Sequence, residues 1–310
     1  MFLSVRGRVL LNVEALNMTE SVGNYVKHRR VPVILPEGGY TTLFVPAISG
    51  ESIAHGFQAL LAEVAKKKGL PVCKLCERGI FLKSTNKNVF REAFGREPPD
   101  DLEEEVIRGC IVEDIGGFLY AGEANVKRTS NFFTGYMIPA KESLENSLIE
   151  PQLHSRYALG TPFVGREQEQ RGQTIYYVEL SSAVYIFSFD FDARFVGKTT
   201  FSYENVGREV VGDRKSRIEA ALEAFQKFLI EFWFGAKKTR FMPIIEWESL
   251  LLAVSDDVWT VPSPFAKNYI EKAKKKLEKV NCNTKLFVYP EMGSFEEVVI
   301  EAVEEAKKRI

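Results

Sequence analysis

The chain has little of the material from which catalytic sites are usually built. Its 310 residues include only three histidines and four cysteines, and no histidine stands in an H-E-x-x-H metal motif. Neither a G-x-S-x-G nucleophile motif nor a phosphate-binding G-x-x-x-x-G-K-[ST] loop occurs. Because nucleophilic catalysis needs a base within reach of an activated Ser or Cys, the sequence offers little support for an enzyme, and we expect no catalytic residues.

The four cysteines form no complete metal motif. Cys73 and Cys76 make one C-x-x-C pair, and Cys110 and Cys282 stand alone. A structural zinc site needs four ligands, and we find no second pair at matching spacing. A thioredoxin-like context for the pair is also missing. We therefore expect unrelated thiols, with no metal site and no cofactor.

Membrane and export signals are missing too. No apolar run is long enough to cross a bilayer, and Arg6 and Arg8 interrupt any apolar segment of a signal peptide at the N-terminus. The apolar and charged fractions, 45% and 27%, are typical of soluble globular proteins. We expect a cytoplasmic protein with no membrane partner.

The formal net charge is only −1, but the charges are segregated along the chain. Acidic residues collect in residues 100–105 and in the last helix, whereas basic residues collect in residues 27–30, 127–128 and 237–240. Ordinary solvated surface is the simplest reading of any one cluster. A nearly neutral chain can nevertheless carry one basic groove that is balanced by acid elsewhere.

Periodicity predicts an α+β protein. Alternating apolar residues predict strands at 4–16 and 174–191, and we assign the aromatic stripe of the second to the core. Helical periodicity predicts helices at 50–68 and 214–232, the first capped by Ser49 or Ser52 and the second by Asp213. The remaining expected elements are a polar loop at 17–30, a hairpin at 31–35 and 40–46, a strand at 244–254, a helix at 267–280, a strand at 285–289 and a last helix with the capping box Ser294–Glu297.

Without its insertions, this order is strand, helix, strands, helix, strand. It is the βαββαβ ferredoxin-like pattern, which is also the plan of the RNA-recognition motif (RRM). We expect a palm formed by residues 1–69 and 174–255, with large insertions forming helical and thumb-like subdomains in residues 70–173. Residues 256–310 form a C-terminal helical extension packed on the palm.

One basic loop indicates polyanion binding. In the stretch FGAKKTRFMP, Lys237, Lys238 and Arg240 lie between Gly235 and Pro243. Glycine permits close approach of backbone to ligand, and arginine can contact a phosphate with two parallel hydrogen bonds. The loop would join the second palm helix to the last palm strand.

Two further segments could join this loop at one end of the fold. The polar loop carries Asn17 and Ser21 and leads into Lys27, His28 and Arg29, which suit contacts to sugar and phosphate. Residues 49–52, Ser-Gly-Glu-Ser, open the first helix, where free N–H groups can bind an anion. Plain helix capping is the alternative for this second segment, and Glu51 weakens its attraction for anions.

Six stretches in order resemble the DevR-type proteins of the RAMP superfamily in CRISPR systems, in particular the backbone subunits of archaeal type I-A Cascade complexes. The resemblance covers most of the chain up to about residue 254. The stretches are LNMTESVGNYVKHR, VPAISGESIAHGFQ, GGFLYAGEANVKRTS, QLHSRYA, VELSSAVYIFSF and FGAKKTRFMP.

This resemblance implies a non-catalytic subunit that binds CRISPR RNA without reading its sequence. Copies would stack into a helical filament along one guide RNA, in which acidic residues of one copy meet basic residues of the next. The filament would present the guide for pairing with target DNA. A thumb-like hairpin, placed at 158–174 with Arg166 and Arg171, would fold over the RNA. Other expected partners are a RAMP subunit capping the guide 5′ end, small and large subunits, and a helicase-nuclease that cuts.

The resemblance also implies site residues. Because the guide sequence varies, the protein must hold the RNA through its phosphate and 2′-hydroxyl groups, which suits polar and basic side chains. The loop at 237–240 matches the family's glycine-rich loop but keeps only Gly235, with Ala236 following. The expected RNA-binding residues are Asn17, Ser21, Lys27, His28, Arg29, Ser49, Gly50, Ser52, His154, Lys237, Lys238 and Arg240.

Two alternatives remain open. A RAMP endoribonuclease that processes precursor CRISPR RNA would share the fold and use His28 or His154 as general base. A transcriptional autoregulator, which the family name suggests, would need sequence-specific duplex binding, and the sequence shows no helix-turn-helix pattern.

Overall fold

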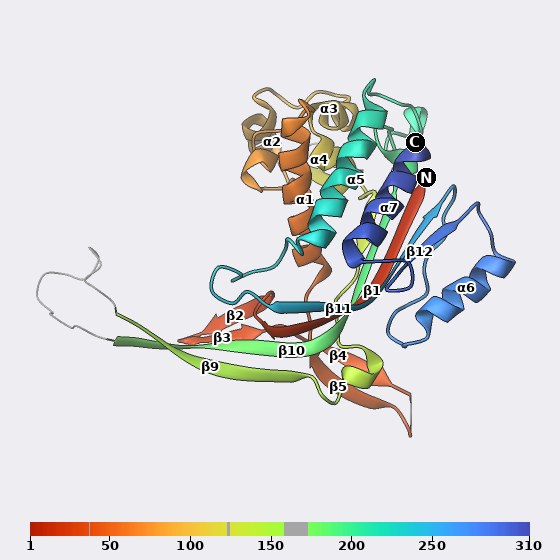
Figure 1. Ribbon diagram of the computed structural model, residues 1–310. Coiled ribbons are helices and arrows are strands. Elements are labelled where there is room, and N and C mark those ends of the chain that lie inside the picture. Colours follow the sequence, from red (N-terminus) through yellow and green to blue (C-terminus); the bar gives the residue numbers. More distant parts are fainter. Residues whose placement is uncertain (37, 123–124, 158–172) are drawn as a thin grey trace, which may run out of the picture.

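The computed structural model describes residues 1–36, 38–122, 125–157 and 173–310 of the chain (Figure 1). The thumb-like hairpin expected at 158–174, with Arg166 and Arg171, therefore lies almost entirely outside the described residues. Two long strands lead to this segment and away from it, and together they project from the body of the molecule (Figure 1).

One large mixed sheet organises the described residues. Its order is β12-β11-β1-β10-β3-β2, and two further strands, β8 and β9, also pair with β10. The pairs are antiparallel except for β10 with β3. The strands are β1 (Phe2–Glu14), β2 (Met18–Val22), β3 (Tyr25–His28), β8 (Phe132–Thr134), β9 (Leu148–Tyr157), β10 (Gln173–Asp192), β11 (Ile244–Ser255) and β12 (Lys285–Tyr289).

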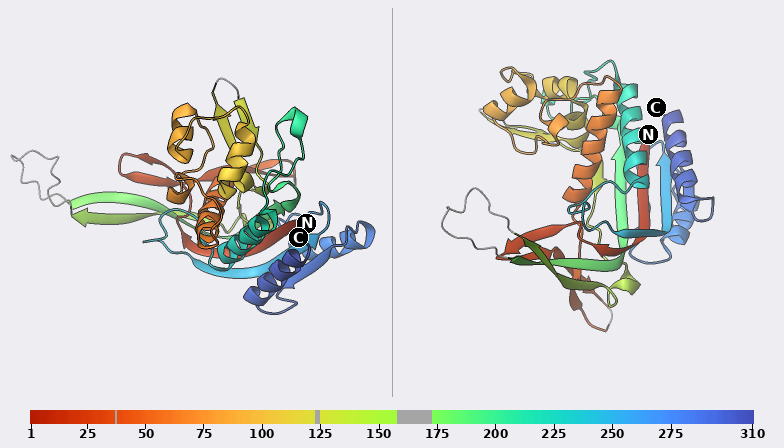
Figure 2. Two further views of the ribbon diagram at one scale, coloured as in Figure 1. Left: turned by 90° about the horizontal axis from the view of Figure 1, so that it is seen from above. Right: turned by 60° about the vertical axis from the view of Figure 1, so that its left-hand side comes forward.

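Helices cover both faces of this sheet (Figure 2). On one face lie α1 (Gly50–Lys67), α5 (Arg214–Ile230) and α7 (Phe295–Lys308), whose apolar side chains share one core cluster with those of β1 and β10. On the other face, α6 (Tyr269–Lys279) packs with Trp259 and Val261 against Leu251 and Ala253 of β11. The C-terminal segment thus contacts both faces of the sheet near β11 and β12.

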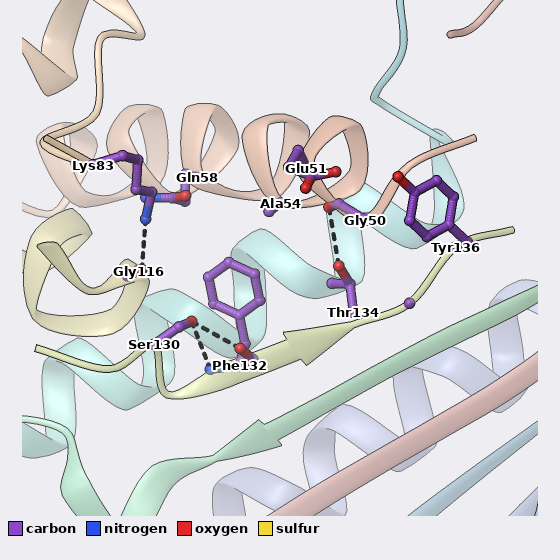
Figure 3. A pocket seen from close by; sticks show the side chains of 11 residues that line it. Gly50, Glu51, Ala54, Gln58, Lys83, Gly116, Ser130, Phe132, Thr134 and Tyr136 are labelled. Atoms are coloured by element: carbon purple, nitrogen blue, oxygen red, sulfur yellow. Dashed lines mark hydrogen bonds between the residues drawn. The ribbon is translucent and has the colours of Figure 1, made fainter. Parts of the chain in front are cut away.

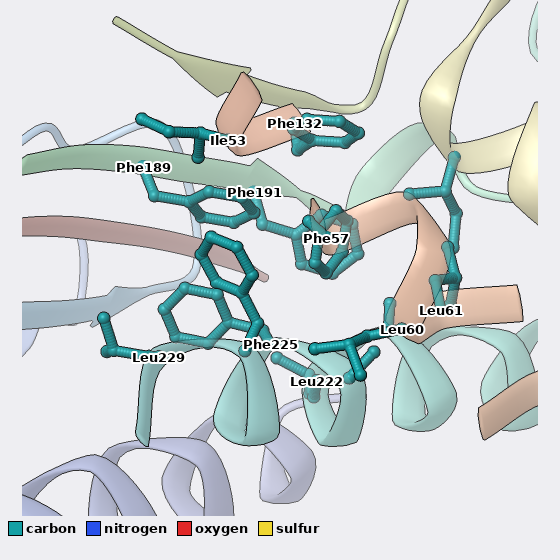
Figure 4. Packing of buried hydrophobic residues seen from close by; sticks show 14 of the residues in the cluster. Ile53, Phe57, Leu60, Leu61, Phe132, Phe189, Phe191, Leu222, Phe225 and Leu229 are labelled. Carbon is teal, nitrogen blue, oxygen red and sulfur yellow. The ribbon is translucent and has the colours of Figure 1, made fainter. Parts of the chain in front are cut away.

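Aromatic rings fill the main core between α1, α5 and β10 (Figure 4). The Phe57 ring meets those of Phe132 and Phe189 edge-on, with centroids 4.8 and 5.1 Å apart, and Phe189 lies 4.8 Å from Phe225. Each such pair adds about 0.5–1.5 kcal/mol beyond the burial of its area. The prediction that the aromatic stripe of β10 belongs to the core is confirmed, because its members are buried: Tyr185, Phe187, Phe189 and Phe191.

Residues 70–131 form a lobe on the outer side of α1, here called the inserted lobe (Figure 1). The sequence interpretation extended the insertion to residue 173, but β8 and β9 of that stretch pair with β10 in the main sheet. The lobe contains α2 (Lys87–Phe94), α3 (Leu102–Gly109), α4 (Ile111–Gly116), β6 (Phe118–Ala121), β7 (Asn125–Arg128) and a short 3-10 turn, Cys76–Arg78.

Strand β1 does not keep its alternation to the end. The register with β10 shifts between Leu11 and Glu14, and Val13 has a φ of +57°. This bulge reverses the last two side chains, so Val13 is 47% exposed while Glu14 is fully buried. Unbroken alternation over residues 4–16 predicts Glu14 on the polar face with Arg6 and Asn12, and the bulge makes that prediction wrong. Residues 17–30, expected as a loop, instead form the β2–β3 hairpin and the start of the next one, β4 (Arg30–Leu35) with β5 (Thr41–Pro46).

The helix caps follow the sequence in two of three cases. Ser49 caps α1 by accepting a hydrogen bond from the Ser52 N–H at 3.4 Å, and α7 has the predicted capping box. The expected cap of α5 was wrong, because the Asp213 carboxylate accepts from Arg217 Nε at 2.7 Å instead.

Part of the predicted surface charge is buried. Glu103 and Glu104 are 4% and 6% exposed, and Arg128 is 3% exposed. Glu103 accepts hydrogen bonds from three successive backbone N–H groups, those of residues 200–202. These residues are thus unavailable for stacking between copies. Among the described helices, none combines the length and apolarity that crossing a bilayer requires.

Candidate nucleic-acid interface

Asn17 connects three chain segments at the end of β1. Its side-chain oxygen accepts hydrogen bonds from the Ser49 N–H at 2.9 Å and from Arg29 Nε at 2.8 Å. Its backbone oxygen accepts from the Arg29 N–H at 2.9 Å, and Arg29 O in turn accepts from the Ala47 N–H. Among the described residues, no hydrogen bond uses the amide nitrogen of Asn17, so this donor is available to a ligand. We call this arrangement the Asn17 clasp.

The basic loop is attached directly beside the clasp. The Ala236 N–H donates to Leu16 O at 2.7 Å. Gly235 has a φ of +92°, and a Cβ on it would lie 2.7 Å from Leu16 Cδ2. Glycine is therefore needed at position 235 for both backbone conformation and close packing. The group that Gly235 approaches is Leu16, and a close approach of this backbone to a ligand stays a prediction.

The three cations of the loop do not point the same way. Lys237 and Arg240 are exposed, and Arg240 Nη1 donates a hydrogen bond to Thr239 O of its own loop. Lys238 turns inward: its Nζ donates to Phe232 O at 2.6 Å and lies 5.2 Å from the centre of the Trp233 ring. Burial lowers the pKa of Lys238. Lys238 therefore stabilises the chain after α5 and does not reach outward as expected.

Lys27 and Ser21 lie on the β2–β3 hairpin next to the clasp, and both are exposed. Lys27 Nζ is 3.1 Å from the Glu20 carboxylate, but both side chains are about half exposed, so this pair contributes little and can be exchanged for a phosphate contact. Arg29 is half-buried, with its Nε engaged by Asn17. The hairpin thus continues the polar surface of the clasp.

His28 is not part of this surface. It is 2% exposed, with Nε2 2.5 Å from Glu14 Oε1 and Nδ1 2.9 Å from Arg29 O. Glu14 also accepts from the Tyr185 hydroxyl at 2.8 Å. Burial lowers the pKa of His28, but the hydrogen bond and charge of Glu14 outweigh this and raise it. The expectation of an RNA contact at His28 was wrong, because the strand bulge turns Glu14 inward and draws the imidazole after it.

His154 belongs to β9 and lies beside the basic loop. Its ring stacks on Tyr176 at 5.4 Å and meets Phe241 edge-on at 5.2 Å. Its Nε2 is buried and has no hydrogen-bond partner among the described residues. Contact with Phe241 brings His154 to the loop that carries Lys237 and Arg240, and its role in RNA binding stays a prediction.

The start of α1 is more enclosed than expected. Ser49 is 3% exposed and uses its hydroxyl oxygen as the helix cap, so its expected role as an RNA contact was wrong. Ser52 is half-buried, and Gly50 O accepts from Thr134 Oγ1 at 3.0 Å. Gly50 also lines a hollow of about 300 Å³ between α1 and β8 (Figure 3), in which Glu51 and Lys83 supply one charge of each sign.

Sequence reasoning missed the groups that hold this site together. Leu16 and Glu14 looked like the end of a strand, and Phe241 looked like a loop residue. Arg30 was noticed only as a charge, yet its Nη2 lies 3.0 Å from Glu179 of β10. The acidic side chains at 14 and 179, each beside apolar residues of a strand, were the available signal.

The fold and the site define an α+β protein in which loops at one end of a long sheet present basic and amide side chains, an arrangement suited to an extended anionic chain. The chain belongs to the family described as CRISPR-associated negative auto-regulator DevR/Csa2, which it matches over residues 5–274. The resemblance stated from the sequence is thereby confirmed.

Two relatives come from Saccharolobus solfataricus. This chain is 39% identical to "CRISPR-associated protein Cas7/Csa2 1" over 93% of this chain and 88% of the relative. It is also 39% identical to "CRISPR-associated aCascade subunit Cas7/Csa2 2", over 80% of this chain and 78% of the relative. A relative from Thermoproteus tenax, "CRISPR-associated protein Cas7/Cst2/DevR", is 27% identical over 82% and 75%.

Solved structures show the same fold at much lower identity. One chain of a "CRISPR RNA-guided surveillance complex, pre-nicking" aligns with a TM-score of 0.51 and 10% identity, over 99% of this chain and 100% of that one. At this identity the likeness supports the architecture alone.

Proposed function

We propose that this chain is a non-catalytic, sequence-independent backbone subunit that binds CRISPR RNA in a Cascade complex. One observation carries the proposal: two exposed cations, Lys237 and Arg240, stand on a loop that is attached at Leu16 to the Asn17 clasp. Cations and amides without a pocket for a base suit phosphate and 2′-hydroxyl contacts. Membership in the family and the names of the relatives support the same assignment.

The sheet order supports an RRM-like palm. In a βαββαβ unit the strands lie in the order fourth, first, third, second and are all antiparallel. Here β11, β1, β10 and β8 follow that order and are antiparallel. We take α1 and α5 as the two palm helices, so the palm includes β8 in addition to residues 1–69 and 174–255. Residues 256–310 are the extension packed on it.

As a backbone subunit, the protein would act in the cytoplasm and self-associate along the guide, leaving the bases free to pair with target DNA. The further partners would be the subunit capping the guide 5′ end, the small and large subunits, and the helicase-nuclease. Electron microscopy of the purified protein with and without guide RNA tests self-association: helical rods that form only with RNA support it, and isolated particles in both samples oppose it.

Binding and cleavage can be separated in one assay. The protein is incubated with two unrelated RNAs of equal length and with an RNA that contains the CRISPR repeat. We expect equal affinities for the unrelated RNAs and intact repeat RNA. Cleavage at a defined position, lost in His154→Ala, would instead establish the endoribonuclease. His28 does not suit that role, because both ring nitrogens are engaged and the side chain is buried.

The autoregulator alternative predicts a different outcome. Tight binding to one duplex DNA sequence, and weak binding to RNA, would support it and would contradict the RNA-backbone proposal. Mobility shifts with duplex DNA and with single-stranded RNA at the same salt concentration compare the two directly.

A further inference from the structure

Three of the four cysteines lie together inside the inserted lobe. The Sγ atoms of Cys73, Cys76 and Cys110 are all within 4.8 Å of one another. Their residues are 4%, 1% and 0% exposed. Cys73 and Cys76 follow the end of α1, whereas Cys110 lies at the junction of α3 and α4. The fold thus brings Cys110 to the Cys73–Cys76 pair, although it follows Cys76 by 34 residues in the sequence.

A buried carboxylate adjoins the cluster beside Cys76, although it lies outside the group of three sulfurs that are within 4.8 Å of one another. Glu113 of α4 is fully buried, and its Oε1 lies 2.8 Å from Cys76 Sγ. Oε1 also accepts from the Leu82 N–H at 2.9 Å. Oε2 is buried and has no hydrogen-bond partner among the described residues. A buried carboxylate oxygen without a partner is costly, and a cation beside it would remove that cost.

The spacing of these four residues repeats. Cys73-x-x-Cys76 is matched by Cys110-x-x-Glu113, so each segment supplies two ligand atoms separated by two residues. Structural zinc sites are commonly built from two such pairs on separate segments. A search for a second C-x-x-C misses this pair because glutamate occupies its last position.

The spacing of the sulfur atoms fits a single ion. Tetrahedral zinc with Zn–S bonds of about 2.3 Å places its sulfurs roughly 3.8 Å apart, within the 4.8 Å limit observed. An iron–sulfur cluster would hold its cysteines farther apart, since irons and sulfides lie between them. Three thiolates also favour zinc over the hard cations magnesium and calcium, which prefer oxygen.

We propose that Cys73, Cys76, Cys110 and Glu113 bind one structural Zn²⁺ ion. Four anionic ligands leave a net negative charge around a divalent ion. Lys83 is the nearby compensating cation, since it interacts electrostatically with Glu113 and Cys76. Its Nζ is held by Gly116 O and Gly117 O at 2.6 and 3.0 Å, at the end of α4.

The ion would join the chain after α1 to the α3–α4 junction. These two segments also share a backbone hydrogen bond, from the Ile111 N–H to Pro71 O at 2.9 Å. A metal that binds the folded but not the unfolded chain adds its binding free energy to folding. The site therefore fastens the chain after α1 to the α3–α4 junction and stabilises the lobe, independently of RNA binding.

Metal content tests the proposal on the full-length protein. The chain is produced with zinc in the medium, purified without chelators and measured by plasma mass spectrometry. We expect close to one zinc per chain in the wild type and in Cys282→Ser, the matched control for the cysteine outside the cluster. Cys110→Ser should lose zinc, and Glu113→Gln should weaken zinc affinity by roughly 10-fold or more.

Cobalt separates a ligand role from a folding defect. Cobalt added to the metal-free wild type should produce the intense visible absorption of tetrahedral thiolate ligation, with a weaker, shifted spectrum in Glu113→Gln. A chelator should lower the unfolding temperature of the wild type but not that of Cys110→Ser. Wild-type protein that binds neither zinc nor cobalt, or a cobalt spectrum that is identical in folded Cys110→Ser, would overturn the assignment.

Discussion

Arg128 of the inserted lobe and Arg240 of the loop after α5 belong to similar basic clusters in the sequence, but the fold buries the first and exposes the second. The guanidinium of Arg128 is fully buried, 2.5 Å from the Asp114 carboxylate. Arg240 is exposed, and within the described part of the chain its side chain donates a hydrogen bond only to Thr239 O of its own loop. The difference lies in the acidic partners, which are far away in sequence. A run of basic residues thus indicates a binding surface only where no buried acidic side chain forms ion pairs with them.

The largest expected effect concerns the buried arginines of this comparison. Asp114 contacts Arg128 and Arg217, and its two carboxylate oxygens share the Gly197 N–H in a bifurcated hydrogen bond. Removing its charge takes away the counterion that the two buried guanidinium groups share, and leaves Arg128 with Glu103 at 3.5 Å and Arg217 with Asp213 at 2.7 Å as acidic partners. Asp114→Asn should therefore lower the free energy of unfolding by about 3–5 kcal/mol.

Urea unfolding at constant temperature measures this change. The control is Asp257→Asn, because Asp257 pairs with Arg194 at the surface, with a side chain 66% exposed. It should cost at most about 1 kcal/mol. Equal losses in the two variants would show that burial does not separate the two kinds of cation.

A second prediction concerns the buried histidine beneath the interface. Glu14 raises the pKa of His28 above its ordinary value of 6.5, so the protonated ring stabilises the folded protein. This contribution is fully present below about pH 6.5 and is lost as the pH rises through the higher folded-state pKa. At pH 6, His28→Gln should lower the free energy of unfolding by about 1.5–3 kcal/mol.

Unfolding curves between pH 5.5 and about 9 follow the difference between wild type and His28→Gln, which should shrink as the pH rises. His55→Gln, a change at an exposed histidine, should alter the unfolding free energy by less than about 0.5 kcal/mol. A difference that grows with pH would mean that His28 is neutral in the folded protein.

A third prediction concerns the exposed loop after α5, where RNA affinity depends on the position of the loop as well as on its charge. A methyl group at position 235 would collide with Leu16 in a backbone of positive φ. Gly235→Ala should cost about 1–3 kcal/mol of unfolding free energy and lower the affinity for RNA without any change in charge. Titration of labelled RNA together with urea unfolding gives both quantities.

Gly207→Ala is the matched control, because Gly207 also has a positive φ, +82°, but open space around it. It should show only the backbone cost and leave RNA affinity unchanged. If both variants bound RNA like the wild type, attachment of the loop to Leu16 would not matter for binding.

Local patterns predicted much of the fold and only part of the site. The strands, the helices α1 and α5, the core stripe at Phe187 and Phe189, and the caps at Ser49 and Ser294 follow from periodicity and capping chemistry, which depend on neighbouring residues. The outward position of Lys237 and Arg240 agrees with the sequence interpretation as well.

The failures share one cause, which is contact between residues distant in sequence. A bulge in β1 turned Glu14 inward and buried His28, and the carbonyl of Phe232 captured Lys238. Cys110 reached the Cys73–Cys76 pair only through the packing of α3 and α4 on the end of α1. Periodicity and composition contain no information on such pairings.

The salt dependence of RNA affinity tests the central claim most directly. Lys237→Ala/Arg240→Ala is compared with the wild type and with Lys272→Ala/Lys275→Ala, which removes the same charge from exposed positions on α6, away from the loop (Figure 1). For two unrelated single-stranded RNAs, the loop variant should bind roughly tenfold more weakly, and its slope of log affinity against log salt should fall by about 1.4. The α6 variant should match the wild type. Equal losses in both variants, or a loss confined to one RNA sequence, would contradict the account.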